Sequence, residues 1–317
     1  MALLPLKAPS PAIRKDNRPK AILFSQIQCI CWITVTSIFK QLSAKGVSAV
    51  EWMCWRNFTN LIFICFFLKQ RNPADVREIK GMHFWIAGRA FCGNLCFMLG
   101  FYSATLIPLF LMTTLLYTSP LWTSILAYFI NREQIHKYDV LAIILCLTGV
   151  YYITQSSFSQ SEDSLSSHQY EQHMIGIAAA FAMSWIYSMA SICQRKMQDI
   201  YFAVITFWHF AGGSIAGILY YIVVERQWPQ VHSIETYGML LFISVLDFGT
   251  VNAQTISFQN DKSSFVACLG YMSVFYGFLI DQAIFDETIK PKELFGALLV
   301  FATTIALAVF KFKNDKS

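Results

Sequence analysis

Two stretches of this chain resemble one another: "YTSPLWTSILAYFINRE", residues 117–133, and "YMSVFYGFLIDQAIFDE", residues 271–287. At an offset of 154 residues the matching pairs are Tyr117 and Tyr271, Ser119 and Ser273, Glu133 and Glu287. The same offset relates Ser103 to Ser257, and Trp32 precedes Trp185 by nearly the same distance. Because 154 is about half of 317 residues, the chain is interpreted as two related halves.

The composition indicates an integral membrane protein. Of its residues, 56% are hydrophobic and only 14% are charged, whereas soluble domains carry about 25% charged residues. A net charge of +5 fits nucleic acid or anionic lipid, but the charges lie between apolar segments, which favours a role in orientation over nucleic acid binding. The nine cysteines lie inside apolar runs, with no CxxC or His-flanked spacing, so we expect buried thiols, no metal site and no cofactor.

Apolar segments long enough to span a bilayer recur along the chain. A spanning helix needs about 20 mostly apolar residues. Ten segments qualify, over residues 21–43, 46–68, 83–104, 107–130, 137–155, 174–194, 200–224, 235–258, 263–285 and 291–311. They lack the period-two alternation of strands, so the prediction is an all-α bundle of ten transmembrane helices in the lipid bilayer.

The basic residues predict the orientation of the chain. Seventeen of the 24 Lys and Arg residues fall on the side that holds the N-terminus, five fall on the other side, and Arg56 and Arg89 lie within helices. Cytosolic loops carry the excess of Lys and Arg, so both termini are expected in the cytosol. Residues 1–20 lack the order of a signal peptide and are read as a cytosolic tail, as are residues 312–317.

The domain organisation follows from the repeat and from one long loop. Residues 156–173, "SSFSQSEDSLSSHQYEQH", contain no Lys or Arg and are interpreted as a non-cytosolic linker between repeats at 21–155 and 174–311. His168 and His173, five residues apart, are not expected to bind a metal. Five helices per half is an odd number, so the second half enters the membrane from the opposite side, as in transporters whose site lies between inverted repeats.

These features resemble the drug/metabolite transporter superfamily, specifically its EamA-type members, which are related to nucleotide-sugar and solute carrier transporters. The resemblance covers about residues 20–312 and rests on "EWMCWRNF" with Arg56, and on the stretches ending at Glu133 and Glu287. The second stretch has Val274 in place of Pro120, and the second half has no equivalent of Arg56, so the halves need not act alike. The resemblance implies alternating access, and solutes that include amino acids, nucleotide sugars, purines and drugs.

Ionisable residues inside predicted helices are the first candidates for a site, because they usually face a cavity or a partner. Arg56 lies near the middle of its helix, with Asn60 on the same face. It either attracts an anionic group or forms a fixed ion pair with Glu51 or Asp247. Asp247 shares a face with Gln254, seven residues later, so the two predict a polar stripe along a cavity. The Asp247 carboxylate fits a proton site, a site for a cationic solute or a salt bridge to Arg56.

Two further polar residues leave their roles open. Arg89 lies about six residues inside its helix, on the face of Gly93 and Gly100. It fits an anchor reaching the headgroups, a gate or a solute contact. His209 lies near Gly213 and Gly217, a small-residue packing pattern, and fits a packing residue or a proton relay.

Aromatic residues in the repeated stretches are candidates for cavity walls. Tyr117 and Tyr128 share one helical face, and Tyr271 and Gln282 repeat that spacing; packing and cavity roles both fit. In the family that the chain resembles, these helices line the central cavity. Pro120, read as lying inside a helix, fits a hinge or a tolerated kink.

The predicted function is secondary transport of a small-molecule solute. No Walker loop is found, so ATP-driven pumping is not expected, while proton coupling, exchange and facilitated diffusion all fit. A scaffold or receptor, and an intramembrane enzyme, are the alternatives; neither HExxH nor GxSxG occurs. A monomer and a homodimer fit equally, and the sequence does not distinguish the plasma membrane from an internal one.

Overall fold

The computed structural model is a bundle of helices, and no strand occurs in the part of the chain that it describes. It describes residues 17–69, 81–107, 112, 115–135, 137–158, 167–225, 232–273, 275–276 and 291–314. The first repeat contributes α1 (Arg18–Ala44), α2 (Ala49–Lys69), α4 (His83–Leu106), α6 (Ser119–Leu126) with a π-helical turn η1 (Ala127–Asn131), and α7 (Lys137–Phe158). The second contributes α8 (Ser167–Lys196), α9 (Phe202–Tyr220) with a π-helical turn η3 (Tyr221–Glu225), α10 (Ile234–Asn260), α11 (Ser263–Leu269) and α13 (Pro291–Asn314).

Five of the described helices are long and apolar enough to cross a membrane. They cover Arg18–Ala44, His83–Ala104, Glu171–Lys196, Phe202–Val223 and Ile234–Asn260. Many large apolar side chains on the outside of the bundle are exposed, among them Phe66, Phe91 and Ile222 at 65%, 69% and 67%. In water such a surface would be unfavourable, whereas hydrocarbon accommodates it.

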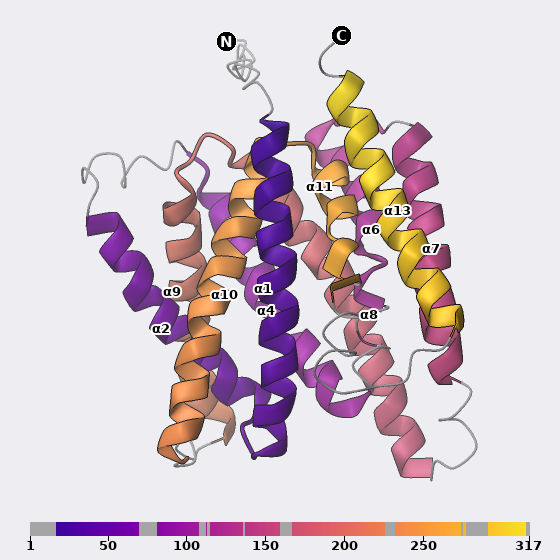
Figure 1. The fold of residues 1–317 in the computed structure, drawn as a ribbon. Helices are drawn as coiled ribbons and strands as arrows, with labels where there is room; N and C mark the ends of the chain where they lie inside the picture. Colours follow the sequence, from indigo (N-terminus) through magenta and orange to yellow (C-terminus); the bar gives the residue numbers. More distant parts are fainter. Residues whose placement is uncertain are drawn as a thin grey trace, which may run out of the picture.

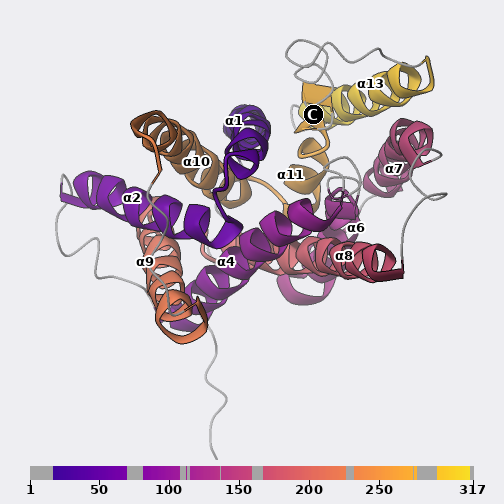
Figure 2. The same cartoon turned by 90° about the horizontal axis from the view of Figure 1, so that it is seen from below.

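The principal helix contacts pair the two halves. α1 packs on α10, α4 on α8, α2 on α9, α6 on α11 and α7 on α13. In order along each half, α1, α2, α4, α6 and α7 correspond to α8, α9, α10, α11 and α13. Exchanging corresponding helices turns the α1–α10 contact into the α8–α4 contact. The other three contacts each join a helix to its own counterpart. Figures 1 and 2 show α1 beside α10, and α7 with α13 at one side of the bundle.

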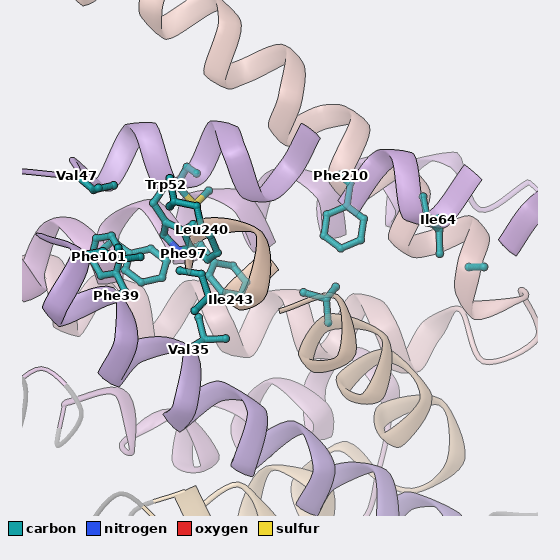
Figure 3. Close-up of a cluster of buried hydrophobic side chains, with 14 residues drawn as sticks. Val35, Phe39, Val47, Trp52, Ile64, Phe97, Phe101, Phe210, Leu240 and Ile243 are labelled. Carbon is teal, nitrogen blue, oxygen red and sulfur yellow. The ribbon is translucent and has the colours of Figure 1, made fainter. Parts of the chain in front are cut away.

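The largest apolar cluster packs aromatic rings from both halves. Phe39 of α1, Trp52 of α2 and Phe101 of α4 lie in edge or tilted contacts with ring centroids 4.5–6.3 Å apart, and Phe97 of α4 stacks on Phe101 at 6.2 Å. Leu240 and Ile243 of α10 and Phe210 of α9 join the same cluster (Figure 3). Since α9 and α10 belong to the second half, burial of these side chains holds the halves together.

Three expectations about helix boundaries are wrong. Pro120 is not inside a helix: it occupies the first turn of α6, after a turn at Tyr117 and Thr118, where its missing N–H costs no hydrogen bond. Residues 156–173 are not all loop, because α7 extends to Phe158 and α8 begins at Ser167. The helix expected over 263–285 is interrupted after Leu269 by a turn at Gly270 and Tyr271, and the chain is helical again at Met272 and Ser273; residues 277–285 lie outside the described residues.

Candidate functional site

The two broken helices surround a cavity between the halves. Tyr117, Ser119 and Pro120 at the start of α6 line it, as do Gly270 and Ser273 after the end of α11. The breaks therefore fall at equivalent positions of the two halves, one at Tyr117 and the other at Tyr271. A helix break leaves backbone groups without intrahelical partners, and such groups can contact a ligand.

Further lining residues come from helices of both repeats. Gln28 and Trp32 of α1, Cys96 and Phe97 of α4, Met183 and Tyr187 of α8, and Thr250 and Gln254 of α10 complete the wall. The volume of the cavity is about 50 Å³. That is room for a few water molecules, whereas sites for small ligands enclose roughly 300–1,000 Å³.

A buried ion pair lies behind Phe97. Arg56 Nε donates to Asp247 Oδ2 at 2.6 Å, and both side chains are fully buried. Asn60 donates to the same oxygen at 2.9 Å, and the Arg56 guanidinium lies 3.7 Å from the centre of the Phe97 ring. Of the two partners proposed for Arg56 from the sequence, Asp247 is the one that the structure places there.

Glu51 lies in a different contact. Its carboxylate is 2.9 Å from His232 Nε2, and both side chains are buried. The serine before α2 accepts from the Glu51 backbone N–H. The proposed pairing of Glu51 with Arg56 is therefore wrong, because Glu51 begins its helix and faces the segment that precedes α10.

Arg89 is 2% exposed and forms the second centre of the polar network. Its Nη1 lies 3.3 Å from His209 Nδ1, and its Nη2 donates to Gln254 Oε1 at 3.4 Å. With the amide of Gln194 turned so that its oxygen faces the guanidinium, that oxygen lies 2.9 Å from Nε and 3.1 Å from Nη2. The interpretation of Arg89 as an anchor in the headgroups is wrong, because its side chain points into the bundle.

His209 connects the two arginines. Its Nε2 lies 3.5 Å from Arg56 Nη2, its Nδ1 faces Arg89, and its carbonyl accepts from Asn94 at 2.8 Å. Gly93 makes room for this arrangement, because a Cβ there would overlap both the Arg89 guanidinium and the His209 ring. Gly213 and Gly217, expected to serve close packing, lie against Asn57 with Asn94 and against Cys54.

The tyrosines of the repeat occupy different surroundings. Tyr117 is 6% exposed and lines the cavity, and Tyr271 is fully buried against it. Tyr128 is 55% exposed, so the expectation that it shares a cavity wall with Tyr117 is wrong. Gln282 lies outside the described residues. Metal ligands are not grouped anywhere in the described ranges, where no set of three His, Cys, Asp or Glu side chains converges.

A second polar cluster lies at the start of α11, close to the start of α1. Figure 1 shows this end of the bundle, where α1 begins and α13 ends. Arg132 adopts a left-handed conformation (φ 56°), and the Glu133 N–H then donates to the Ala127 carbonyl. This turn directs Glu133 at the start of α11, where its carboxylate accepts from the Ser263 N–H at 2.9 Å. Arg195 at the end of α8 lies 3.5 Å from it.

The Glu133 cluster, defined as Asn131, Glu133, Arg195 and Ser263, joins the two halves. Asn131 lies 3.3 Å from the Ser263 hydroxyl. Nearby, Arg18 of α1 pairs with Asp261, which follows α10, at 2.8 Å. Burial raises the pKa of Glu133 above its ordinary value, while Arg195 and the bonds from Ser263 act in the opposite direction.

Sequence reasoning missed several members of both networks. Gln194 was overlooked because it directly precedes Arg195 and Lys196 and so read as the end of a helix. Asn57 and Asn94 are polar residues within apolar helices, as Asn60 is, and that pattern could have identified them as members of a buried network. Glu133 stands out in the sequence because Glu287 matches it in the second half. Its partners Arg195 and Ser263 lie 62 and 130 positions away along the chain, so the sequence does not reveal them.

Comparisons with known proteins agree with this architecture. A model of the EamA-like transporter family matches residues 19–155 and 174–309. The chain is 23% identical over 301 residues to human Solute carrier family 35 member G1, covering 95% of this chain and 82% of that protein. An uncharacterized transporter of Helicobacter pylori J99 is 21% identical over 281 residues, covering 87% of this chain and 90% of that protein. One solved crystal structure, at 14% identity, shares the fold with a TM-score of 0.76 over 95% of this chain and 100% of that one.

Proposed function

The chain belongs to the EamA-like transporter family and is a multi-pass membrane transporter; on that premise we propose that it is a secondary transporter of a small organic solute. It works by alternating access, and the solute binds in the cavity between the halves. We place residues 1–20 and 312–317 in the cytosol, the two repeats at 21–155 and 174–311, and the segment between the end of α7 and the start of α8 on the non-cytosolic side.

The observation that carries this proposal is the position of the cavity. It is bounded by two helices that are broken at equivalent points of the two halves, near Tyr117 and Tyr271. Discontinuous helices at a repeat interface are the usual place for the solute in transporters built from inverted repeats. Polar side chains such as Gln28, Tyr187 and Gln254 supply hydrogen-bonding groups in a wall that is otherwise mostly apolar.

The proposed topology has ten spanning helices in two inverted repeats, with both termini in the cytosol. Equivalent helix contacts in the two halves support the inverted relation. The distribution of Lys and Arg supports the orientation. On this orientation the Glu133 cluster and the Arg18–Asp261 pair lie at the cytosolic end of the bundle.

A closed cytosolic end suits one step of a transport cycle. The Glu133 cluster ties α6 and η1 to α8 and α11, and the cavity is too small for a metabolite. Opening towards the cytosol therefore requires these contacts to break and the halves to move apart.

Uptake into vesicles tests the proposal. The purified protein is reconstituted into liposomes, a pooled metabolite set is supplied outside, and the interior is read by mass spectrometry. Entry of one solute class, reduced by Gln28→Leu at the cavity wall but not by Tyr128→Phe at the exposed face, supports the proposal. If no solute enters while the protein is folded and inserted, the chain is not a transporter of that set and the scaffold alternative gains support.

A further inference from the structure

The buried polar network carries more positive than negative charge. It contains two guanidinium groups, Arg56 and Arg89, and one carboxylate, Asp247, within the described residues. Asp247 is committed to Arg56 at 2.6 Å and to Asn60 at 2.9 Å. An unpaired charge inside a membrane protein is unfavourable unless it serves a ligand or a partner, so the surplus cation calls for an explanation.

Arg89 is that surplus cation. The groups within hydrogen-bond distance of its guanidinium in the described chain are the His209 ring and the amide oxygens of Gln254 and Gln194. All of these solvate a cation, but none supplies a negative charge. A guanidinium has five N–H donors and binds carboxylate or phosphate oxygens in a two-point arrangement.

The His209 ring cannot accept from all of the N–H donors that face it. Its Nε2 faces Arg56 Nη2 at 3.5 Å, and its Nδ1 faces Arg89 Nη1 at 3.3 Å and Asn94 Nδ2 at 3.3 Å. A neutral imidazole accepts at one nitrogen only, so N–H donors on both sides of the ring exceed what it can take. An added anionic oxygen would accept from the donor that His209 cannot satisfy.

The surplus charge lies next to the cavity. Gln254 contacts Arg89 and also lines the cavity. Cys96 is another lining residue, and it lies seven residues beyond Arg89 on the same face of α4. Gln254 therefore connects the Arg89 guanidinium to the cavity wall.

A second positive feature faces the same cavity. Ser119 and Pro120 at the N-terminus of α6 line it, and Thr118 does not cap this terminus, because its hydroxyl contacts the Leu115 carbonyl and Ser184. The N-terminus of a helix carries a partial positive charge and favours anions, but this one is weak, because Pro120 has no N–H and the Leu121 N–H donates to the Thr118 carbonyl. It acts in the same direction as Arg89 and comes from a different part of the chain.

We infer that the transported solute carries a carboxylate or phosphate group, which binds Arg89 after displacing Gln254 and compensates the surplus charge. The inference rests on the proposed transport function and adds its substrate class. It also assigns different roles to the two arginines: Arg56 is a structural partner of Asp247, and Arg89 is a solute ligand.

The test uses matched pairs of anionic and neutral solutes in phosphatidylcholine liposomes. The pairs are succinate and succinamide, glucose 6-phosphate and glucose, and uridine monophosphate and uridine. Uptake is compared for the wild type, Arg89→Gln, Arg89→Lys and Gln254→Glu. Lys45→Gln removes the same charge from an exposed ion pair with Glu235 and serves as the control.

We expect at least one anion to enter at least about tenfold faster than its neutral partner. Arg89→Gln removes most of that uptake, Arg89→Lys retains part of it, and Lys45→Gln leaves it unchanged. Gln254→Glu places a carboxylate beside Arg89, so it should block anion uptake and raise the unfolding temperature in the absence of solute. This variant decides the question if Arg89→Gln does not fold, because it supplies a counter-charge instead of removing one.

The outcomes separate the inference from the proposed function. Uptake confined to neutral or cationic solutes, or anion uptake unchanged in folded Gln254→Glu, overturns the inference and leaves transport in place. Absence of uptake for every pair with folded wild-type protein counts against both. Faster entry of the anion in both the carboxylate and the phosphate pairs would show a general anion site. Faster entry of the anion in only one kind of pair would identify the group that the site binds.

Discussion

The rings of Tyr117 and Tyr271, the first residues of the two matching stretches, lie 6.2 Å apart between centroids at an interplanar angle of 36°. Equivalent residues of two repeats contact one another only near the axis that relates the repeats. In the proposed inverted-repeat topology, Tyr117 and Tyr271 therefore mark that axis, and the two helix breaks meet there. A cavity on the axis can be reached from either end of the bundle by equivalent movements of the two halves.

Tyr271→Phe tests whether this contact is packing or part of the solute site. The Tyr271 hydroxyl is buried, and no described group forms a hydrogen bond with it. Removing an unsatisfied buried hydroxyl relieves a cost of about 1–3 kcal/mol at most. We expect the unfolding temperature in detergent to stay equal or rise, with uptake retained. Tyr128→Phe at the exposed face is the control, and a marked fall in stability for Tyr271→Phe alone would contradict this assignment.

Breaking the Arg56–Asp247 pair should be costly. Both side chains are fully buried, and removal of one partner leaves the other charge without compensation, which typically costs about 3–5 kcal/mol. Asp247→Asn is therefore expected to lower the unfolding temperature more than the double variant Arg56→Gln/Asp247→Asn. The matched control is Glu235→Gln in the exposed pair with Lys45, worth about 0–1 kcal/mol. Equal effects of the buried and exposed substitutions would argue against a structural pair.

Gly93→Ala should disturb the position of Arg89. The new methyl group would overlap the guanidinium and the His209 ring, so one of these side chains must move. Overpacking of this kind costs about 1–3 kcal/mol, and displacement of Arg89 should also reduce anion uptake. Gly238→Ala in α10 meets no atom within 4 Å and should be neutral or stabilising. Unfolding temperatures and uptake rates of the two variants are compared in parallel; unchanged behaviour of Gly93→Ala would exclude a tightly held guanidinium.

Glu133 should make the stability of the bundle end that holds the Glu133 cluster depend on pH. Its pKa in the folded protein is raised above the ordinary value of 4.5, chiefly by burial. A carboxyl group with a raised pKa favours the folded state at low pH, and this contribution is lost as the pH rises through the raised pKa. The unfolding temperature of the wild type, relative to Glu133→Gln, should thus fall as the pH rises from 4.5. A difference that grows with pH would mean that Arg195 outweighs the effect of burial.

The sequence predicted most helices because an apolar run of about 20 residues leaves few other structures in a bilayer. α1, α2, α4 and α10 begin and end within a few residues of their expected bounds. The break before Pro120 escaped prediction, because the residues on both sides of Tyr117 are equally apolar. The helical start of α8 at Ser167 was missed since its first turns are polar and resemble the preceding loop.

The candidate site was predicted only in part. A single charged residue in an apolar helix is visible in a sequence, so Arg56, Arg89, His209 and Asp247 were found. Their partners depend on how helices pack: Arg56 and Asp247 are 191 positions apart. Glu51 and Asp247 were equally plausible partners until the fold placed Glu51 beside His232. Amides such as Gln194 become visible as site residues only when their neighbours are known.

The most direct test of alternating access is a reversible cross-link across the Glu133 cluster. Asn131 and Ser263 contact one another at 3.3 Å and belong to different halves, so the variant Asn131→Cys/Ser263→Cys is oxidised and its disulfide is verified by mass spectrometry. The measurement is solute uptake by this variant before and after oxidation, with oxidised wild type as the control for its native cysteines. The account predicts that oxidation stops uptake and that a reductant restores it, because the halves must separate at this end. Uptake at the wild-type rate with the cross-link intact would contradict it.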